Sequence, residues 1–370
     1  MRKLFLLIFV LLMPVLVVSA QDDEQDDQDT MEMPAITWEC PEGFEGQTLT
    51  VYNWATYIGE TTISDFEELC GVDVIYDVYD TNESLIARMR LGNPGYDIAF
   101  PSDYAVSIMV NDGLLQPIDL EKIPNFANVA EEWVGLDFDP ENQYSVPYLW
   151  GSQGIGYNVE AVGEEITSWY QVFEYDGPVA WLNDARGMLS VALNLLGYDP
   201  NSTDPDEIQE AADFLLENSD NVIVLAADDG EALLERGEVD IVVEYNGDIF
   251  QVMLNCECDD YTYVIPDEGS TVFVDVMVIL KDAPNPELAH VFIDYILDPV
   301  VNAQIINTTG YASPSNVPLE MGLVDPTLAE NPAIYVPEEK LENVWFLQDT
   351  GDAEVYYSDA WEALTIFIGE

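Results

Sequence analysis

Residues 49–57 read Leu-Thr-Val-Tyr-Asn-Trp-Ala-Thr-Tyr, a short β-forming run that ends in a loop with two large aromatic side chains. The segment at 61–69 returns apolar residues at helical spacing, so the sequence predicts a strand, a loop and a helix. In open α/β sheets, ligands bind beyond the carboxyl ends of strands, where this loop lies. Trp54 and Tyr57 are therefore candidate ligand contacts. The alternative is that both rings only cap the core, because buried aromatic residues are common.

Strand-like and helix-like segments alternate through the rest of the chain. Residues 72–79 and 96–100 favour strands, with a helical segment at 83–91 between them. A second α/β block follows the glycine-rich passage at 150–156, which lacks the Gly-Lys-Ser/Thr of a phosphate loop. A long apolar run at 271–280 then returns the chain to the first block. This order predicts two α/β lobes joined by two or more crossings.

The composition limits the possible partners. The chain has 370 residues with 48% hydrophobic content, enough for a large core and two domains of typical size. It carries 72 acidic and only 9 basic residues, a formal net charge of -63, which repels phosphate backbones and anionic lipids. We therefore expect no nucleic-acid partner. Most of the acids should coat the surface, as in proteins kept soluble at high salt, and the remainder favour a cationic ligand.

The amino terminus has the pattern of a secretory signal. Arg2 and Lys3 precede an apolar stretch at 4–18, and small residues follow it before a cleavage point after Ala20. We assign residues 1–20 to a signal peptide and 21–45 to an acidic leader and amino-terminal segment. An uncleaved anchor is the alternative, although the stretch is shorter than the roughly 20 residues that span a bilayer. The protein is thus expected to cross the cytoplasmic membrane and act on its periplasmic or extracellular face.

The four cysteines favour disulfides in an exported chain. A zinc site is disfavoured, because the sequence has one histidine and the Cys-x-Cys pair at Cys256 and Cys258 lacks a second compact pair. In a right-handed strand and helix unit, the helix end near Cys70 returns to the start of the first strand, close to Cys40. This favours Cys40 with Cys70, and leaves the other two paired or free. The three possible connectivities remain open.

No enzyme chemistry is specified by the sequence. A serine or cysteine nucleophile needs a nearby base, and the one histidine, His290, lies in an apolar helical segment. Carboxylate pairs for glycoside hydrolysis are uninformative in so acidic a chain. Anionic ligands are usually held by Arg or Lys, and only Arg186 lies in a candidate site loop. We expect no catalytic residues, no cofactor and no metal.

Five motifs in register resemble the exported spermidine/putrescine-binding proteins of ABC importers. They are YNWATY at 52–57, YDTNE at 79–83, YDIAFPS at 96–102, VPYLWG at 146–151 and DYILDP at 294–299. The resemblance spans residues 48–365. It implies an α/β, two-lobed periplasmic-binding-protein-like fold of type II, in which each lobe is a mixed sheet flanked by helices and the ligand binds in the interlobe cleft. Lobe 1 would comprise 46–150 plus 276–315, and lobe 2 would comprise 151–275 plus 316–370.

The family implies an extracytoplasmic substrate-binding component of an ABC importer, not an enzyme. It would capture a polyamine, putrescine or spermidine, and deliver it to the permease subunits in the membrane, most simply as a monomer. One alternative is the same scaffold binding another small solute. The other is a secreted acidic hydrolase.

The resemblance also assigns candidate ligand contacts. Aromatic contacts would be Trp54, Tyr57, Tyr104, Tyr245, Phe273 and Tyr311; polar contacts, Ser102 and Gln348; acidic contacts, Asp184, Asp248 and Asp275. Asp184 matches spermidine-type members and Asp248 putrescine-type members, so the choice of polyamine stays open. Gly187 and Thr56 stand where the family has acids, and Arg186 could neutralise Asp184. Carboxylates beside aromatic rings suit a desolvated amine and its methylene chain.

Overall fold

The computed structural model describes residues 33–368, except 228, 257, 259 and 337–342. Its strands form one connected sheet in the order β2-β1-β3-β9-β4-β7-β5-β6, with β10 beside β9 and β8 beside β4. The strands are β1 (Thr48–Asn53), β2 (Asp73–Val78), β3 (Ile98–Ala99), β4 (Ser145–Asn158), β5 (Val179–Leu182), β6 (Val222–Ala226), β7 (Ile241–Tyr245), β8 (Tyr261–Val264), β9 (Thr271–Ile279) and β10 (Trp345–Phe346). The predicted signal at 1–20 lies outside the described residues.

Helices connect and flank these strands. They are α1 (Thr62–Cys70), α2 (Asn82–Arg90), α3 (Asp103–Asn111), α4 (Val159–Val162), α5 (Trp169–Glu174), α6 (Ala185–Leu196), α7 (Pro205–Glu217), α8 (Gly230–Glu235), α9 (Asn246–Cys256), α10 (Pro286–Ile296), α11 (Pro299–Thr309), α12 (Val317–Glu320), α13 (Pro326–Ala329) and α15 (Glu354–Ile368). Four 3-10 turns add to them: η1 (Leu120–Lys122), η2 (Pro124–Asn128), η3 (Glu131–Trp133) and η4 (Gly351–Ala353). Within the described ranges, no helix is both long and apolar enough to cross a membrane.

The opening strand, loop and helix form as the sequence predicts. β1 pairs in parallel with both β2 and β3, so the loop after β1 lies at the same sheet edge as the end of β3. The two helices α10 and α11 each begin with a proline, Pro286 and Pro299. Local signals decide these elements because proline fits the first helical turn and the apolar residues keep a helical period.

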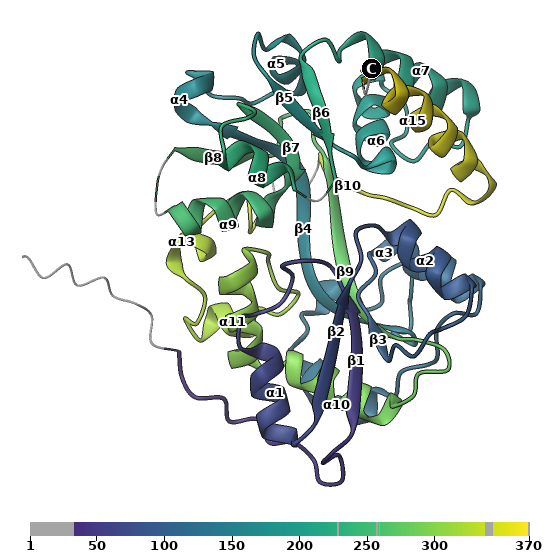
Figure 1. Cartoon of the computed structure of the whole chain (residues 1–370), viewed down its shortest axis with the longest axis vertical. Coiled ribbons are helices and arrows are strands. Elements are labelled where there is room, and N and C mark those ends of the chain that lie inside the picture. The colour runs from purple at the N-terminus through teal and green to yellow at the C-terminus, as the bar shows by residue number, and fades with distance from the viewer. Residues whose placement is uncertain (1–32, 228, 257, 259, 337–342, 369–370) are drawn as a thin grey trace, which may run out of the picture. The chain divides into compact units, whose positions relative to one another are not determined.

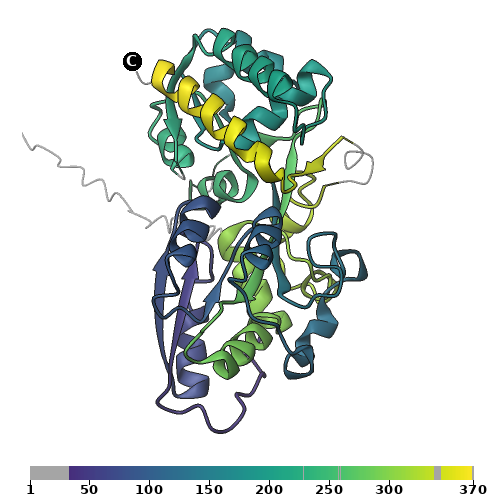
Figure 2. The same cartoon turned by 90° about the vertical axis from the view of Figure 1, so that its right-hand side faces the viewer.

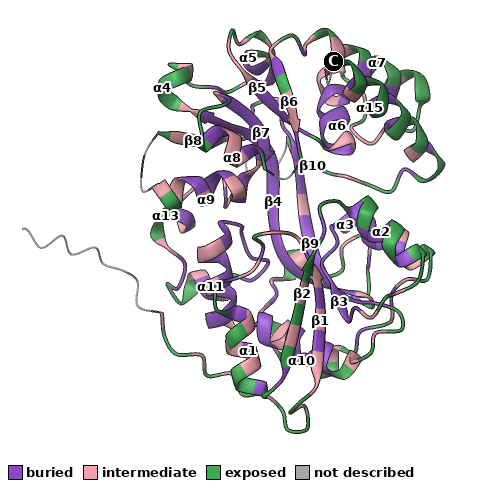
Figure 3. Ribbon diagram, viewed as in Figure 1, coloured by how far each residue is buried: buried purple, intermediate pink, exposed green. Residues whose placement is uncertain are grey.

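The longest strand, β4, connects two groups of strands. Its first half pairs with β9, and its second half pairs with β7 and β8. β9 in turn pairs with β3, so β4 and β9 run from the β1–β3 group to the β5–β8 group (Figure 1). Almost all of β4 is buried, which Figure 3 shows as a continuous purple strand.

The glycine-rich passage at 150–156 is therefore part of the strand that crosses between the two groups. A Cβ on Gly151 would lie 2.5 Å from Asn246 Oδ1, and one on Gly154 would lie 2.5 Å from the Tyr263 hydroxyl. The glycines let neighbouring side chains approach the backbone closely, which is a known use of glycine inside a strand.

The core consists of two clusters of buried side chains. One surrounds β1, β3, β9 and α10 and continues onto β7, β8, α8 and α9, and the other surrounds β5, β7, α6 and α7. The carboxy-terminal helix α15 packs against α6 and α7, as Figure 2 shows. Cys40 is bonded to Cys70, as favoured from the sequence, and Cys256 is bonded to Cys258. The disulfide between Cys40 and Cys70 joins the segment before β1 to the end of α1.

Candidate ligand-binding site

A cavity of about 510 Å³ opens between the ends of β1 and β3, the start of α6, the middle of β9 and the first turns of α15. Ten of the eleven candidate contacts line it: Trp54, Tyr57, Ser102, Tyr104, Asp184, Tyr245, Asp248, Phe273, Asp275 and Tyr311. Gln348 is not among its lining residues, and its exposed side chain follows Leu347, which does line the cavity. The sheet topology thus brings together side chains that are up to 257 positions apart in the sequence (Trp54 to Tyr311).

Asp275 is the most buried of the three predicted acids, with 4% of its surface exposed. Its Oδ1 accepts a hydrogen bond from Ser102 Oγ at 2.7 Å, and its Oδ2 accepts one from the Tyr57 hydroxyl at 2.7 Å. Burial and the neighbouring Asp275 charge hold the pKa of Tyr57 well above its usual value, so Tyr57 remains a donor. Donors of this kind stabilise a carboxylate that has lost much of its water.

Asp103 lies beside Asp275 at the start of α3 and is also buried. Its carboxylate oxygens accept hydrogen bonds from the backbone N–H groups of Tyr104 at 2.7 Å and Val274 at 3.3 Å. Burial, to which the charge of Asp275 adds, raises the pKa of Asp103 to about 8. The raised pKa favours the protonated form of Asp103 at neutral pH.

Aromatic rings form a continuous wall across the cavity. The ring centroids of Tyr245 and Phe273 lie 5.3 Å apart, those of Phe273 and Tyr311 lie 6.1 Å apart, and those of Tyr311 and Tyr57 lie 5.0 Å apart. All three pairs meet edge to face, an arrangement that aromatic quadrupoles favour. The wall presents apolar surface with hydroxyl groups at its ends.

The loop after β1 contributes the next part of this lining. Trp54 donates a hydrogen bond from Nε1 to the carbonyl of Phe100 at 2.7 Å, and its ring lies 4.5 Å from that of Tyr79. Thr56 has a φ of 47°, a backbone conformation that is uncommon for a β-branched residue, and it turns the chain sharply between the two rings. Trp54 and Tyr57 consequently both face the cavity, although Tyr57 also packs in the core.

Asp248 and Asp275 bind the hydroxyl groups of two neighbouring rings, Tyr311 and Tyr57. Asp248 lies in the first turn of α9, where its Oδ2 accepts a hydrogen bond from the Tyr311 hydroxyl at 2.7 Å and its Oδ1 accepts one from Gln251 at 3.2 Å. Tyr57 is close enough to both acids for each of them to raise its pKa. Asp275 and Asp248 therefore form one acidic group at one end of the aromatic wall.

Asp184 lies at the other end of the wall as the N-cap of α6. Its Oδ1 accepts hydrogen bonds from the backbone N–H groups of Arg186 at 3.0 Å and Gly187 at 3.1 Å, and its Oδ2 accepts one from the Tyr245 hydroxyl at 3.3 Å. Burial raises the pKa of Asp184, while the two N–H groups and the charge of Arg186 oppose that rise. The cap explains the local fold, and the remaining oxygen faces the aromatic wall.

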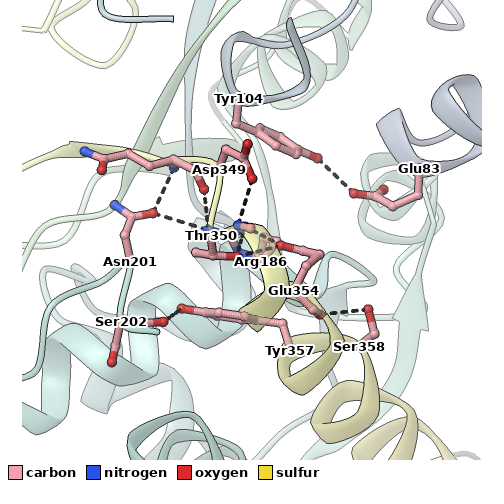
Figure 4. A network of polar contacts seen from close by, with 12 residues as sticks. Glu83, Tyr104, Arg186, Asn201, Ser202, Asp349, Thr350, Glu354, Tyr357 and Ser358 are labelled. Carbon is pink, nitrogen blue, oxygen red and sulfur yellow. Dashed lines mark hydrogen bonds and ion pairs between the residues drawn. The ribbon is translucent and has the colours of Figure 1, made fainter. Parts of the chain in front are cut away.

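The Arg186 guanidinium pairs with Glu354, not with Asp184 (Figure 4). Arg186 Nη1 lies 2.8 Å from Glu354 Oε2, which also accepts a hydrogen bond from Thr350 Oγ1 at 2.9 Å. The guanidinium carbon lies 4.5 Å above the ring of Tyr357, and Nη2 donates to the backbone carbonyl of Gln348 at 3.0 Å. Gln348 thus supports the wall of the cavity through its main chain.

Glu83 faces this group from α2, where it accepts a hydrogen bond from the Tyr104 hydroxyl at 3.0 Å (Figure 4). Glu83 is exposed on one side. Its pKa is nevertheless raised, mainly because nearby protein atoms exclude water from the carboxylate, and further by the negative charges of Asp184 and Glu354. Three acids therefore lie close enough to repel one another at this end of the cavity.

Sequence reasoning missed Asp103, Glu83 and Glu354 as cavity residues. Two of them lie in or beside motifs already quoted, since Glu83 ends YDTNE and Asp103 follows YDIAFPS directly. That adjacency was the available signal. Glu354 has no such signal, because it is one acid among many in the carboxy-terminal segment. Within the described ranges, no group of three or more His, Cys, Asp and Glu side chains could hold a metal ion.

A mixed α/β fold with an acidic and aromatic cavity between two groups of strands defines a solute-binding protein. The chain belongs to the bacterial extracellular solute-binding protein family, whose sequence pattern matches residues 61–334. This membership confirms the predicted fold, the predicted extracytoplasmic location and the prediction of a binding protein instead of an enzyme.

Characterised relatives cover most of the chain. It is 33% identical over 324 residues to the spermidine/putrescine-binding periplasmic protein of Escherichia coli (strain K12), covering 86% of this chain and 92% of that protein. It is 32% identical over 315 residues to the putrescine-binding periplasmic protein PotF of the same organism, covering 80% and 85%. The solved structure of the spermidine/putrescine ABC transporter substrate-binding protein PotD from Streptococcus pneumoniae matches with a TM-score of 0.74 and 31% identity, covering 87% and 100%.

Proposed function

We propose that this protein is the extracytoplasmic substrate-binding component of an ABC importer and that its ligand is a polyamine, putrescine or spermidine. The relatives that cover most of the chain are named for these ligands. The observation that carries the proposal is Asp275, a carboxylate with 4% of its surface exposed that lines a cavity walled by aromatic rings. A carboxylate so placed suits an ammonium group that must leave water.

The ligand's charges and its hydrocarbon chain meet different parts of the cavity. Two acidic groups, one with Asp275 and Asp248 and one with Asp184, lie at the ends of the aromatic wall, so each can receive an ammonium group. The rings between them cover the methylene chain, and a cation over a ring face gains about 0.5–2 kcal/mol. A neutral solute would bring no positive charge to these carboxylates. The arrangement therefore favours a ligand with at least two separated positive charges.

The eleven candidate residues keep the roles given from the sequence as parts of this proposal. Aromatic contacts are Trp54, Tyr57, Tyr104, Tyr245, Phe273 and Tyr311; acids are Asp184, Asp248 and Asp275; polar residues are Ser102 and Gln348. Gln348 does not line the cavity, and its main-chain carbonyl accepts a hydrogen bond from Arg186. We also propose that lobe 1 (46–150 plus 276–315) and lobe 2 (151–275 plus 316–370) close on the ligand as a monomer. The loaded protein would then deliver the polyamine to permease subunits in the membrane.

Isothermal titration with putrescine, cadaverine, spermidine and spermine tests the proposal. Wild-type protein should bind at least one of them, and Asp275→Asn should weaken that binding by at least tenfold, about 1.4 kcal/mol. Near-ultraviolet circular dichroism checks that the variant folds. Asp73→Asn, an exposed change on β2 outside the cavity, is the matched control and should bind like wild type. No heat with any polyamine, or an unchanged Kd in Asp275→Asn, would refute the proposal.

A further inference from the structure

Position 187 is crowded by two neighbouring side chains. A Cβ on Gly187 would lie 2.4 Å from Gln153 Oε1 and 2.7 Å from Asp184 Oδ2. Approaches below about 3 Å require one of these side chains to move, and Asp184 is fixed by the cap of α6. Glycine at this position therefore leaves Asp184 as the acid that the start of α6 brings to the cavity.

Glu354 brings a carboxylate to the same end of the cavity from a different element. It is the first residue of α15 and lines the cavity together with Asp184 and Arg186. Its Oε2 is held by Arg186 and Thr350. Across the described part of the chain, no hydrogen bond reaches its Oε1, and 37% of the side chain is exposed. One oxygen is thus fixed while the other is open to a ligand.

The two residues that hold Glu354, Arg186 and Thr350, are themselves buried. The Arg186 side chain is only 3% exposed, packs over Tyr357 and donates through Nη2 to Asn201 and Gln348. Such a buried guanidinium is a rigid, permanently charged donor. Figure 4 shows it between Glu354 and the segment at 348–350. The position of Glu354 is therefore built by the fold and does not depend on a flexible surface side chain.

The charge balance at this end of the cavity is also unfavourable without a cation. Glu83, Asp184 and Glu354 contribute three carboxylates, and Arg186 contributes one positive charge. The carboxylates are close enough for Asp184 and Glu354 to raise the pKa of Glu83. An ammonium group placed here would relieve that repulsion.

We infer that Glu354 is a specificity-determining residue that receives the distal ammonium group of the polyamine. Arg186 and Thr350 are the positioning residues that direct it. The inference rests on the proposed function and adds a requirement for the ligand. The end of the ligand that lies beside α6 and α15 must carry a charged amine, so polyamines acylated at that end bind more weakly.

The test compares each polyamine with its monoacetylated forms, because acetylation removes one charge and keeps the carbon chain. Kd is measured by titration for spermidine with N1- and N8-acetylspermidine, and for putrescine with N-acetylputrescine. In wild type the free amine should bind at least tenfold more tightly. In Glu354→Gln this preference should fall at least fivefold, because the distal charge no longer meets a carboxylate. Asp359→Asn, the same change of charge on α15 outside the cavity, should keep the wild-type preference.

A second pair of variants separates direct contact from simple neutralisation of Arg186. Arg186→Gln with Glu354→Gln has the same total charge as wild type. If Glu354 contacts the amine, the double variant still shows the reduced preference, whereas recovery of the wild-type preference would overturn the inference. Thr350→Val keeps both charges and removes the hydrogen bond from Thr350 to Glu354. It should therefore weaken the binding of free polyamines at least twofold and leave the Kd of the acetylated forms unchanged. It also supplies the test if the double variant fails to fold.

The outcomes distinguish this inference from the function beneath it. If wild type binds no polyamine, the proposed function fails. If wild type binds a polyamine and Asp275→Asn weakens it, yet Glu354→Gln keeps the full preference for the free amine, only the role of Glu354 is refuted.

Discussion

Replacing Asp103 with asparagine should change how the stability of the protein depends on pH. Asp103 is 3% exposed and accepts hydrogen bonds from two backbone N–H groups, and its pKa is raised to about 8. Asparagine has nearly the same shape and does not titrate. Its amide nitrogen cannot accept the bond from Val274, so the substitution also carries a cost that does not vary with pH.

The sign and size of the pH effect follow from the two pKa values. In the unfolded chain an aspartate titrates at about 3.9, so the folded state holds the proton more tightly. The resulting stabilisation is fully present below about pH 3.9 and is lost as the pH rises through about 8. Each pH unit between these values costs up to about 1.4 kcal/mol of unfolding free energy. From about pH 5 to about pH 8 the wild type should therefore lose up to about 4 kcal/mol through this group.

Urea unfolding of the ligand-free protein at several pH values measures the effect. The other cavity acids titrate in both proteins, so the difference between wild type and Asp103→Asn isolates Asp103. Between about pH 5 and about pH 8, the unfolding free energy of the variant should rise relative to that of the wild type by at least about 2 kcal/mol. Asp73→Asn, on the exposed face of β2, should keep the wild-type slope. Two parallel curves for wild type and Asp103→Asn would refute the assignment of a buried, protonated acid.

Two further changes test other parts of the structure. Trp54→Ala removes the ring that packs on Tyr79 and should weaken polyamine binding at least tenfold in a titration, whereas Trp54→Phe keeps a ring and should lose less; equal affinities for all three proteins would exclude a ligand role for Trp54. Cys40→Ser with Cys70→Ser removes the disulfide that closes a loop with a sequence separation of 30. The unfolding free energy measured with urea should fall by about 3–4 kcal/mol, and an unchanged urea midpoint would show that the bond does not form.

The parts of the fold that could be predicted are those with local signals. β1, its loop and α1 follow from a change of period, and α10 and α11 from proline after an N-cap residue. The path of β4 could not be predicted in the same way. Its glycines read locally as breaks, and only the contacts from Asn246 and Tyr263 show why a strand there must carry glycine.

The site was predictable where its residues lie inside contiguous motifs. Trp54, Tyr57 and Ser102 belong to such motifs, and the structure brings them to one cavity. Asp103 and Glu354 were missed because a chain with 72 acids offers no local mark for the few that become buried or paired. Which carboxylates leave the solvent depends on long-range packing, here of α3 on β9 and of α15 on α6.

The position of Asp275 within β9 has a mechanical consequence. β9 pairs with β10 at its start and with β3 at its end, and Asp275 lies near its middle, opposite Leu149 of β4. A ligand that pulls on this carboxylate loads a strand that belongs to both groups of strands. The force passes along one backbone in both directions and does not have to cross a flexible loop. If Asp275 binds the ligand as proposed, occupancy of the cavity is transmitted to both ends of the sheet along this one strand.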